Sequence, residues 1–310
     1  MKENIKCAVI WMMLLAAVPT FSLMTEKKPQ EGASSPSQVT LECSDNKYFS
    51  VYFSDAEEVR DIPADDYVTG AVLAQMPWEY SEEALKAQAV AANTYALRLK
   101  GSGDGYDFTD SRSDYQEFFT EAEARAFFGD DYDAAYQKVR AACEAVSGEY
   151  LAWQGEPIAA VFHAYSSGYT ESAEYAFGEA VPYLQSTESM TSGDDTEDIV
   201  MTYAEISARY EAEYNEKPSG DILRITEKSP ASTVISADLF GRNVTGAELC
   251  RILNIPSQRF DFSDNGDSLT FTVSGTGHLC GMCQSGAEEM AEDGADYKAI
   301  LMHFYGVQPS

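Results

Sequence analysis

The segment AVLAQMPWEYSEEALKAQAVAANTYALR, residues 71–98, contains two helical patterns separated by a proline. Val68, which precedes the segment, and Ala71, Val72 and Gln75 at its start follow the i, i+3, i+4, i+7 spacing of one helix face. Pro77 ends this first helix because proline cannot donate the backbone hydrogen bond that a helix needs. The side-chain amide of Gln75 is therefore predicted to point inward, towards the core or a cleft.

The limits of both helices follow from their flanking residues. Pro63 suits the first helical position of the first helix, and Ser81 suits the N-cap of the second. The predicted buried stripe of the second helix consists of leucines and alanines: Leu85, Ala89, Ala92, Ala96 and Leu99. Because most of these side chains are small, we expect a neighbouring element to pack closely against this helix.

The rest of the chain alternates between strand-like and helical patterns. Strands are predicted at 47–54, 149–153, 157–166 and 268–275, with a hairpin turn at Gln154–Gly155, and helices before Gly148, at 203–214, from about Gln284 and after an Asp296 cap. Helices segregated around an irregular, mostly antiparallel sheet indicate an α+β fold. We expect a single elongated domain over residues 40–310.

The composition is that of a folded, strongly acidic protein. Of its 310 residues, 45% are hydrophobic and 23% are charged, which suits a globular domain. The 51 acidic residues against 21 basic ones give a formal charge of −30. Such a surface repels phosphate backbones, so nucleic acid is not an expected partner.

The N-terminus carries a topological signal. Lys2 and Lys6 precede the uncharged run Cys7–Met24, which as a helix would span about 27 Å. Residues 1–24 are therefore predicted to be a membrane anchor or a signal segment, and residues 25–39, rich in Pro, Gly and Ser, a flexible linker. We expect the remainder, 40–310, to be extracytoplasmic, anchored to the cell membrane or secreted to the wall.

The cysteines do not indicate a disulfide framework. Beyond Cys7 there are five, an odd number at scattered positions: Cys43, Cys143, Cys250, Cys280 and Cys283. In HLCGMC, His278 precedes a CxxC pair, but a zinc site needs a fourth ligand and no second CxxC occurs. A disulfide or two small core thiols is favoured there over a metal or redox centre, and no metal or cofactor is predicted.

The three histidines differ in their surroundings. His163 ends a predicted strand and leads into a loop, and His278 lies in a glycine-rich loop. Functional side chains are common at such positions, whereas His303 falls within a helix and is expected to be structural. Among the loop acids, Glu171 and Asp114 stand near tyrosines. In so acidic a chain a loop carboxylate is expected to face water.

Three segments together resemble a known family. They are YVTGAVLAQMPWEYSEEALKAQAVAANTYALR (67–98), PIAAVFHAYSSGYTESAEYAFGEAVPYLQS (157–186) and GTGHLCGMCQSGAEEMAEDGADYKAILMHFYG (275–306). In order and spacing they resemble the stage II sporulation protein D family, which includes the amidase-enhancer domain, over roughly 45–308. The resemblance implies a membrane-anchored lytic transglycosylase that cleaves the glycan strands of peptidoglycan, leaving 1,6-anhydro ends, in sporulation-related wall remodelling. It also implies a peptide-stripping wall hydrolase, stage II sporulation protein P, as a partner.

The family's reaction needs one carboxyl group that protonates the glycosidic oxygen and then takes a proton from the sugar's 6-hydroxyl. The family's glutamate stands in AAEMP, where this chain has Gln75 in LAQMP. Many relatives have Arg at Asn93, and a His-Cys pair often stands where this chain has Asp114 and Tyr115. An amide cannot deliver a proton, so glycan binding with little or no cleavage is favoured. The alternatives are an active enzyme whose acid is Glu171 or Asp114, and a redox or metal protein using His278, Cys280 and Cys283.

The resemblance assigns further polar residues to a glycan-binding cleft. Gln75 occupies the acid position, and the predicted substrate-binding residues are Lys86, Asn93, Asp114, His163, Ser166, Tyr169, Glu171, His278 and Gln284.

Overall fold

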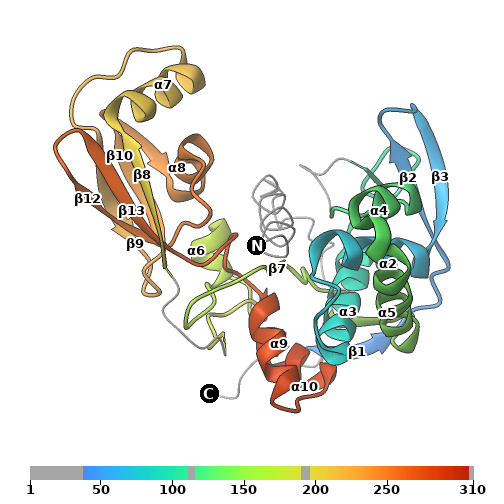
Figure 1. Cartoon of the computed structure of the whole chain (residues 1–310). Coiled ribbons are helices and arrows are strands. Elements are labelled where there is room, and N and C mark those ends of the chain that lie inside the picture. The colour runs from blue at the N-terminus through green and yellow to red at the C-terminus, as the bar shows by residue number, and fades with distance from the viewer. Residues whose placement is uncertain (1–37, 111–115, 190–195, 307–310) are drawn as a thin grey trace. The chain divides into compact units, whose positions relative to one another are not determined.

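The computed structural model describes residues 38–110, 116–189 and 196–306 (Figure 1). These residues form two compact units: unit 1 is the described part of 1–162 together with that of 284–310, and unit 2 is that of 163–283. Each unit combines helices with small, mostly antiparallel sheets, which confirms the predicted α+β class. The prediction of one domain over 40–310 stays a prediction.

Helix α3 (Glu82–Leu99) is the centre of unit 1. It packs against α2 (Ala64–Gln75), α5 (Tyr132–Ala145), α9 (Gln284–Glu292) and α10 (Tyr297–Tyr305) (Figure 1). Its alanines are buried on several faces rather than on one stripe, because helices surround it. The predicted close packing is therefore confirmed, and it involves more partners than the stripe indicated.

The remaining elements of unit 1 are two three-stranded sheets and two short helices. The first sheet has the order β1 (Thr40–Cys43), β5 (Glu149–Trp153), β6 (Glu156–Pro157) and the second the order β3 (Glu58–Pro63), β2 (Tyr48–Phe53), β4 (Phe108–Thr109). Helix α4 (Glu121–Phe128) and the 3-10 turn η1 (Gly129–Asp131) precede α5. The β5–β6 hairpin turns at Gln154 and Gly155, which both have positive φ as in a type I′ turn, and this confirms the predicted hairpin.

Two local predictions in unit 1 are wrong in detail. Helix α2 begins at Ala64, so Pro63 precedes the helix rather than opening it. The strand predicted at 157–166 is interrupted: β6 ends at Pro157, and β7 covers only Phe162–His163. Between them the backbone bonds to itself, from the Ala160 amide to the Ile158 carbonyl and from the Val161 amide to the Ala159 carbonyl.

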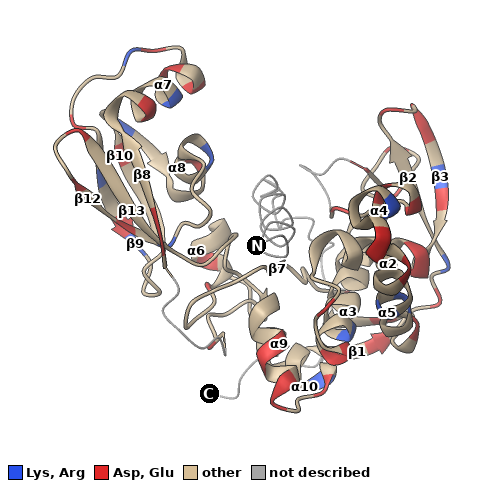
Figure 2. Cartoon of the chain, in the orientation of Figure 1, with Lys and Arg blue, Asp and Glu red and all other residues tan. Residues whose placement is uncertain are grey.

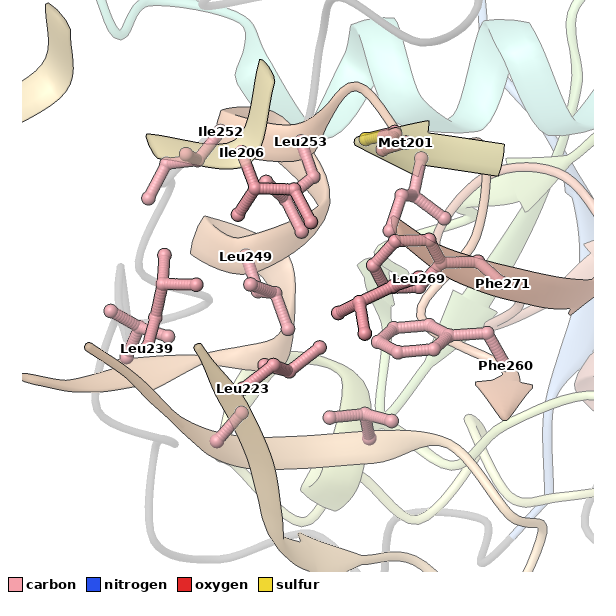
Figure 3. Packing of buried hydrophobic residues seen from close by; sticks show 14 of the residues in the cluster. Met201, Ile206, Leu223, Leu239, Leu249, Ile252, Leu253, Phe260, Leu269 and Phe271 are labelled. Atoms are coloured by element: carbon pink, nitrogen blue, oxygen red, sulfur yellow. The ribbon is translucent and has the colours of Figure 1, made fainter. Parts of the chain in front are cut away.

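Unit 2 has a hydrophobic core of its own between residues 201 and 273 (Figure 3). One antiparallel sheet has the order β12 (Phe260–Asp264), β13 (Ser268–Ser274), β8 (Thr196–Thr202) and the other the order β11 (Arg242–Thr245), β10 (Val234–Leu239), β9 (Leu223–Lys228). Helices α7 (Tyr203–Tyr214) and α8 (Gly246–Leu253) supply Ile206, Leu249 and Leu253 to this core. The remaining elements are α6 (Ala173–Phe177) and β14 (Met282–Cys283), which pairs with β7.

Acidic side chains are distributed over helices and strands of both units (Figure 2). None of the described helices is both long and apolar enough to cross a membrane. The predicted anchor, residues 1–24, lies outside the described residues, as does most of the predicted linker 25–39.

Candidate functional site

Gln75 is the last residue of α2 and faces inward, as its helical spacing predicted. Only 4% of the residue is exposed, and its side-chain Nε2 donates a hydrogen bond to the backbone carbonyl of Glu117. The helix ends immediately afterwards, where Met76 adopts an extended conformation before Pro77. The side chain of Gln75 is therefore held in a fixed, buried place.

Two further glutamines join Gln75 in what we call the amide cluster, formed by Gln75, Gln88 and Gln284. The Nε2 of Gln284 donates to the backbone carbonyl of Gln75 at 2.9 Å and to Oε1 of Gln88 at 3.2 Å. The three residues come from α2, α3 and α9 and are all buried. The predicted residues Gln75 and Gln284 are thus brought together.

The amide cluster can form hydrogen bonds but cannot exchange protons. Within the described part of the chain, the hydrogen bonds of these three side chains go to other amides or to backbone carbonyls. A side-chain amide donates and accepts hydrogen bonds without titrating near neutral pH. The cluster is therefore suited to orienting polar groups and not to general acid catalysis.

Lys86 and Asn93, also in unit 1, make other contacts. Lys86 pairs with two acids of its own helix, Glu82 at 2.7 Å and Glu83 at 2.8 Å, and these hydrogen bonds raise the pKa of Lys86. Asn93 donates from Nδ2 to the backbone carbonyl of Glu149 at 2.9 Å and lines a pocket that Asp65 also lines. Neither side chain bonds to the amide cluster, so their substrate-binding role stays a prediction.

In unit 2 the backbone of Cys280 forms hydrogen bonds with both His163 and His278. Nδ1 of His163 donates to the Cys280 carbonyl at 3.1 Å, and Nδ1 of His278 accepts from the Cys280 amide at 3.1 Å. The two ring centroids are 5.9 Å apart. Burial, and then the neighbouring His278, lower the pKa of His163 well below its ordinary value. His163, only 3% exposed, is therefore a neutral imidazole at neutral pH.

The loop 166–172 carries three more of the predicted residues. Ser166 is buried, and its backbone amide donates to Sγ of Cys283 at 3.3 Å. Tyr169 presents its side chain outward and is 58% exposed. Nη1 of Arg259 donates to the backbone carbonyls of Ser167 at 2.9 Å and Tyr169 at 2.8 Å. Arg259 thereby fixes the tip of the loop.

Glu171, in the same loop, is a buried carboxylate. It is 1% exposed, so the expectation that it faces water is wrong. One carboxylate oxygen accepts from the Ser172 amide at 2.9 Å and the other from Oγ of Ser229 at 2.6 Å. Asp114, the other candidate acid, lies outside the described residues.

The sequence of this chain has relatives of known name. A family model described as "Stage II sporulation protein" matches residues 52–153. Stage II sporulation protein D of Bacillus subtilis (strain 168) is 32% identical over 262 residues, which cover 82% of this chain and 76% of that protein. The Bacillus amyloliquefaciens protein of the same name is 30% identical over the same shares of both chains. The chain belongs to the stage II sporulation protein D family. The amidase enhancer of Bacillus subtilis (strain 168) is 25% identical over 291 residues, covering 76% of this chain and 39% of that protein.

In this member of the stage II sporulation protein D family the CxxC pair consists of two buried free thiols. Burial raises the pKa of the Cys280 thiol, so a reactive thiolate is disfavoured. Among the described residues, no three His, Cys, Asp or Glu side chains are placed to hold a metal ion. The burial and raised pKa of Cys280 weigh against the redox alternative for Cys280 and Cys283.

The sequence analysis did not predict three residues that form part of these sites. Gln88 could have been found, because it lies three residues after Leu85 in a helix whose other buried side chains are mostly small. Ser229 and Arg259 gave no local signal, since each bonds to a loop more than 55 residues away in the chain. Stage II sporulation protein D motifs alone therefore identify the loop but not the residues that hold it.

Proposed function

We propose that this chain is an extracytoplasmic wall protein that binds the glycan strands of peptidoglycan with little or no lytic transglycosylase activity. The observation that carries the proposal is the buried amide of Gln75 at the position of the family's acid. Membership of a sporulation protein family supports a role in wall remodelling during sporulation. The uncharged run Cys7–Met24 supports attachment to the membrane or export.

The surroundings of Gln75 are suited to an uncharged group. Nε2 donates to the Glu117 carbonyl, and a protonated carboxyl group at this position could make the same kind of bond. A carboxylate could not, because both it and the carbonyl are acceptors. Gln75 therefore resembles the neutral, proton-bearing form of the family's acid while lacking a proton that it can transfer.

The loss of this proton has a direct chemical consequence. Lytic cleavage requires a proton on the departing glycosidic oxygen and removal of a proton from the 6-hydroxyl. Positioned acid–base catalysis contributes about 10²–10⁴ in rate. With Gln75 in the acid position, no side chain there can give a proton to the glycosidic oxygen or take one from the 6-hydroxyl. Bound strands are therefore expected to remain intact.

The contacts of Glu171 disfavour the alternative in which this residue replaces the missing acid. Its two oxygens accept hydrogen bonds from Ser172 and Ser229, and the carboxylate is buried within unit 2. A general acid must instead be protonated and free to reach the substrate's oxygen. These contacts support a structural role in the loop.

The test is incubation of the full chain with peptide-free glycan strands, followed by mass spectrometry for 1,6-anhydro products and a sedimentation assay for binding. We expect the wild-type chain to bind strands and release no anhydro product. Gln75→Glu should gain measurable release, because it restores a proton donor at the acid position. The matched control Gln284→Glu, in the same amide cluster but away from the acid position, should gain none.

Each result has a defined meaning for the proposal. Anhydro products from the wild-type chain would refute the loss of catalysis. Strands that fail to sediment with the wild-type chain would refute glycan binding itself. Release by Gln284→Glu equal to that by Gln75→Glu would show that position 75 has no special role.

A further inference from the structure

A pocket in unit 1 lies beside the first turns of α2. It is also lined by the segment before β2, by the middle of α3 and by the end of α5 with the turn that follows. Its empty space is about 310 Å³ including the open mouth, and its interior admits a group of about the size of a water molecule. Asp65 lines the pocket, and Gln75 lies about 15 Å further along the axis of α2. The pocket is therefore separate from the amide cluster.

Asn93, on α3, provides the pocket with an unused hydrogen-bond acceptor. Only 7% of the residue is exposed, and Nδ2 donates to the backbone carbonyl of Glu149 at 2.9 Å. This bond fixes which end of the amide is the donor, and Oδ1 accepts no hydrogen bond from the residues that the structure describes. An acceptor in so buried a residue is costly to leave without a donor, so a donor within the pocket would stabilise it.

Asp65 provides a second acceptor and a negative charge. One of its carboxylate oxygens accepts from Oγ of Ser147 at 2.7 Å, and the other has no partner in the described part of the chain. Arg140, on α5, pairs with the neighbouring Asp66 instead. Burial raises the pKa of Cys143 to about 12, so this thiol, which also lines the pocket, is neutral. Among the described residues that line the pocket, Asp65 is therefore the one with a charge.

The walls of the pocket also include apolar side chains. Val68, Ala89 and Val146 line it and are themselves buried. Apolar walls favour contact with methyl or methylene groups over contact with water. A hydroxyl group donates one hydrogen bond, whereas a primary ammonium group donates three and carries the charge opposite to that of Asp65. Two acceptors, one negative charge and apolar walls therefore match an alkylammonium group.

We infer that this pocket binds a primary ammonium group on a short alkyl chain. The ammonium group donates to Oδ1 of Asn93 and to the free carboxylate oxygen of Asp65, while the alkyl chain contacts Val68 and Val146. Free alkylamines and the side-chain amine of a diamino acid in a peptide share this chemistry. The inference goes beyond the proposed function and does not depend on it, because it rests on the contacts of this pocket alone.

The test is an NMR titration of the full-length wild-type chain that follows the side-chain amide signal of Asn93, assigned by its loss in Asn93→Asp. Ethylammonium chloride is the probe, and tetramethylammonium chloride, which has the charge but no N–H donor, is the control. Sodium chloride keeps the ionic strength constant, because a chain of formal charge −30 attracts any cation. Ethylammonium should shift the signal to saturation and bind about tenfold more tightly than tetramethylammonium, as expected for one charge-assisted hydrogen bond.

Asp65→Asn separates the charge from the shape of the pocket, because asparagine has the same size and keeps an acceptor oxygen for Ser147. It should weaken ethylammonium binding about tenfold. Asp66→Asn is the matched control, since it removes the same charge from the next residue, which does not line the pocket, and it should keep the wild-type affinity. The signal of the wild-type chain provides a measurement that needs no folded charge variant.

Nα-Acetyl-lysine amide, whose only cation is its side-chain ammonium group, identifies the source of the ligand. Tighter binding than that of ethylammonium would assign the pocket to a peptide-borne amine, and weaker binding would assign it to free alkylamines.

Equal wild-type affinity for ethylammonium and tetramethylammonium would overturn the inference, because attraction by the net charge would then explain the binding. Equal weakening by Asp65→Asn and Asp66→Asn would overturn it for the same reason. If neither ethylammonium nor the lysine derivative shifted the Asn93 signal, the pocket would not be an ammonium site. Glycan binding, measured separately by sedimentation, would be unaffected by any of these results.

Discussion

The side-chain Nε2 of Gln284 donates a 2.9 Å hydrogen bond to the backbone carbonyl of Gln75, which joins the first residue of α9 to the last residue of α2. Helix termini leave backbone carbonyls without helical partners, and this bond satisfies one of them. The same nitrogen also bonds to Gln88. One buried amide thus links three helices next to Gln75, the residue that the sequence resemblance assigns to the acid position.

Gln284→Ala should destabilise unit 1 by about 2–3 kcal/mol, because it leaves the Gln75 carbonyl and the Gln88 oxygen buried without this donor. Urea denaturation followed by circular dichroism measures the change. Gln137→Ala, at an exposed position on α5, is the control and should change the free energy of unfolding by less than about 0.5 kcal/mol. Equal effects of the two substitutions would show that the amide cluster has no structural role.

His163 should make stability depend on pH. Burial lowers the pKa of His163 in the folded state below its unfolded value of about 6.5, so the unfolded chain binds more protons below that pH. The stabilisation is therefore complete above about pH 6.5 and decreases as the pH falls towards the folded pKa.

Urea unfolding of wild type and His163→Gln between about pH 5 and 7.5 measures this contribution, with the window set by the unfolded histidine pKa. The wild-type free energy of unfolding should fall more steeply with acidification than that of the variant. Gln137→Ala, which removes an exposed side chain that does not titrate, should keep the wild-type slope. Identical slopes for wild type and His163→Gln would contradict a depressed pKa.

Glu171→Gln should destabilise unit 2 by about 1–3 kcal/mol, because an amide nitrogen, which can only donate, replaces one of the two oxygens that accept from Ser172 and Ser229. Thermal unfolding measures the change, and Glu174→Gln at the exposed start of α6 is the control. If instead Glu171→Gln abolished a lytic activity present in the wild-type chain without loss of stability, Glu171 would be the replacement acid.

Prediction from the sequence was most accurate for features that neighbouring residues in the chain determine. The inward direction of Gln75 followed from helical spacing and Pro77, and the turn at Gln154 and Gly155 followed from its neighbours; both are confirmed. Helix α10 after Asp296 also begins as predicted, with the Asp296 carboxylate accepting from the Ala299 amide at 2.8 Å.

The errors arose where distant segments decide the structure. The apolar run 158–160 is buried, and burial alone does not distinguish a strand from an irregular segment. Glu171 was expected in water because nothing near it in the chain marks Ser229 as its partner. Such partners become visible only when the sheets of unit 2 bring residues 229 and 259 to the loop.

Gln75→Glu should place a carboxyl group whose pKa is raised above the ordinary glutamate value of about 4.3. Burial disfavours the charged form, and the Glu117 carbonyl can accept a bond only from the protonated form. The folded state then binds more protons than the unfolded state between about pH 4.3 and the raised pKa. Stability relative to wild type should therefore fall as the pH rises through this window, by about 1.4 kcal/mol for each unit of pKa difference.

Carbon-13 NMR of the labelled side-chain carboxyl group measures the pKa of the introduced glutamate directly. Gln137→Glu, at the exposed position on α5, supplies the reference and should titrate near 4.3. A pKa for Glu at position 75 equal to that reference would mean that the amide cluster does not favour a neutral group. A raised pKa would show that these surroundings hold a carboxyl group at position 75 in the proton-donating form.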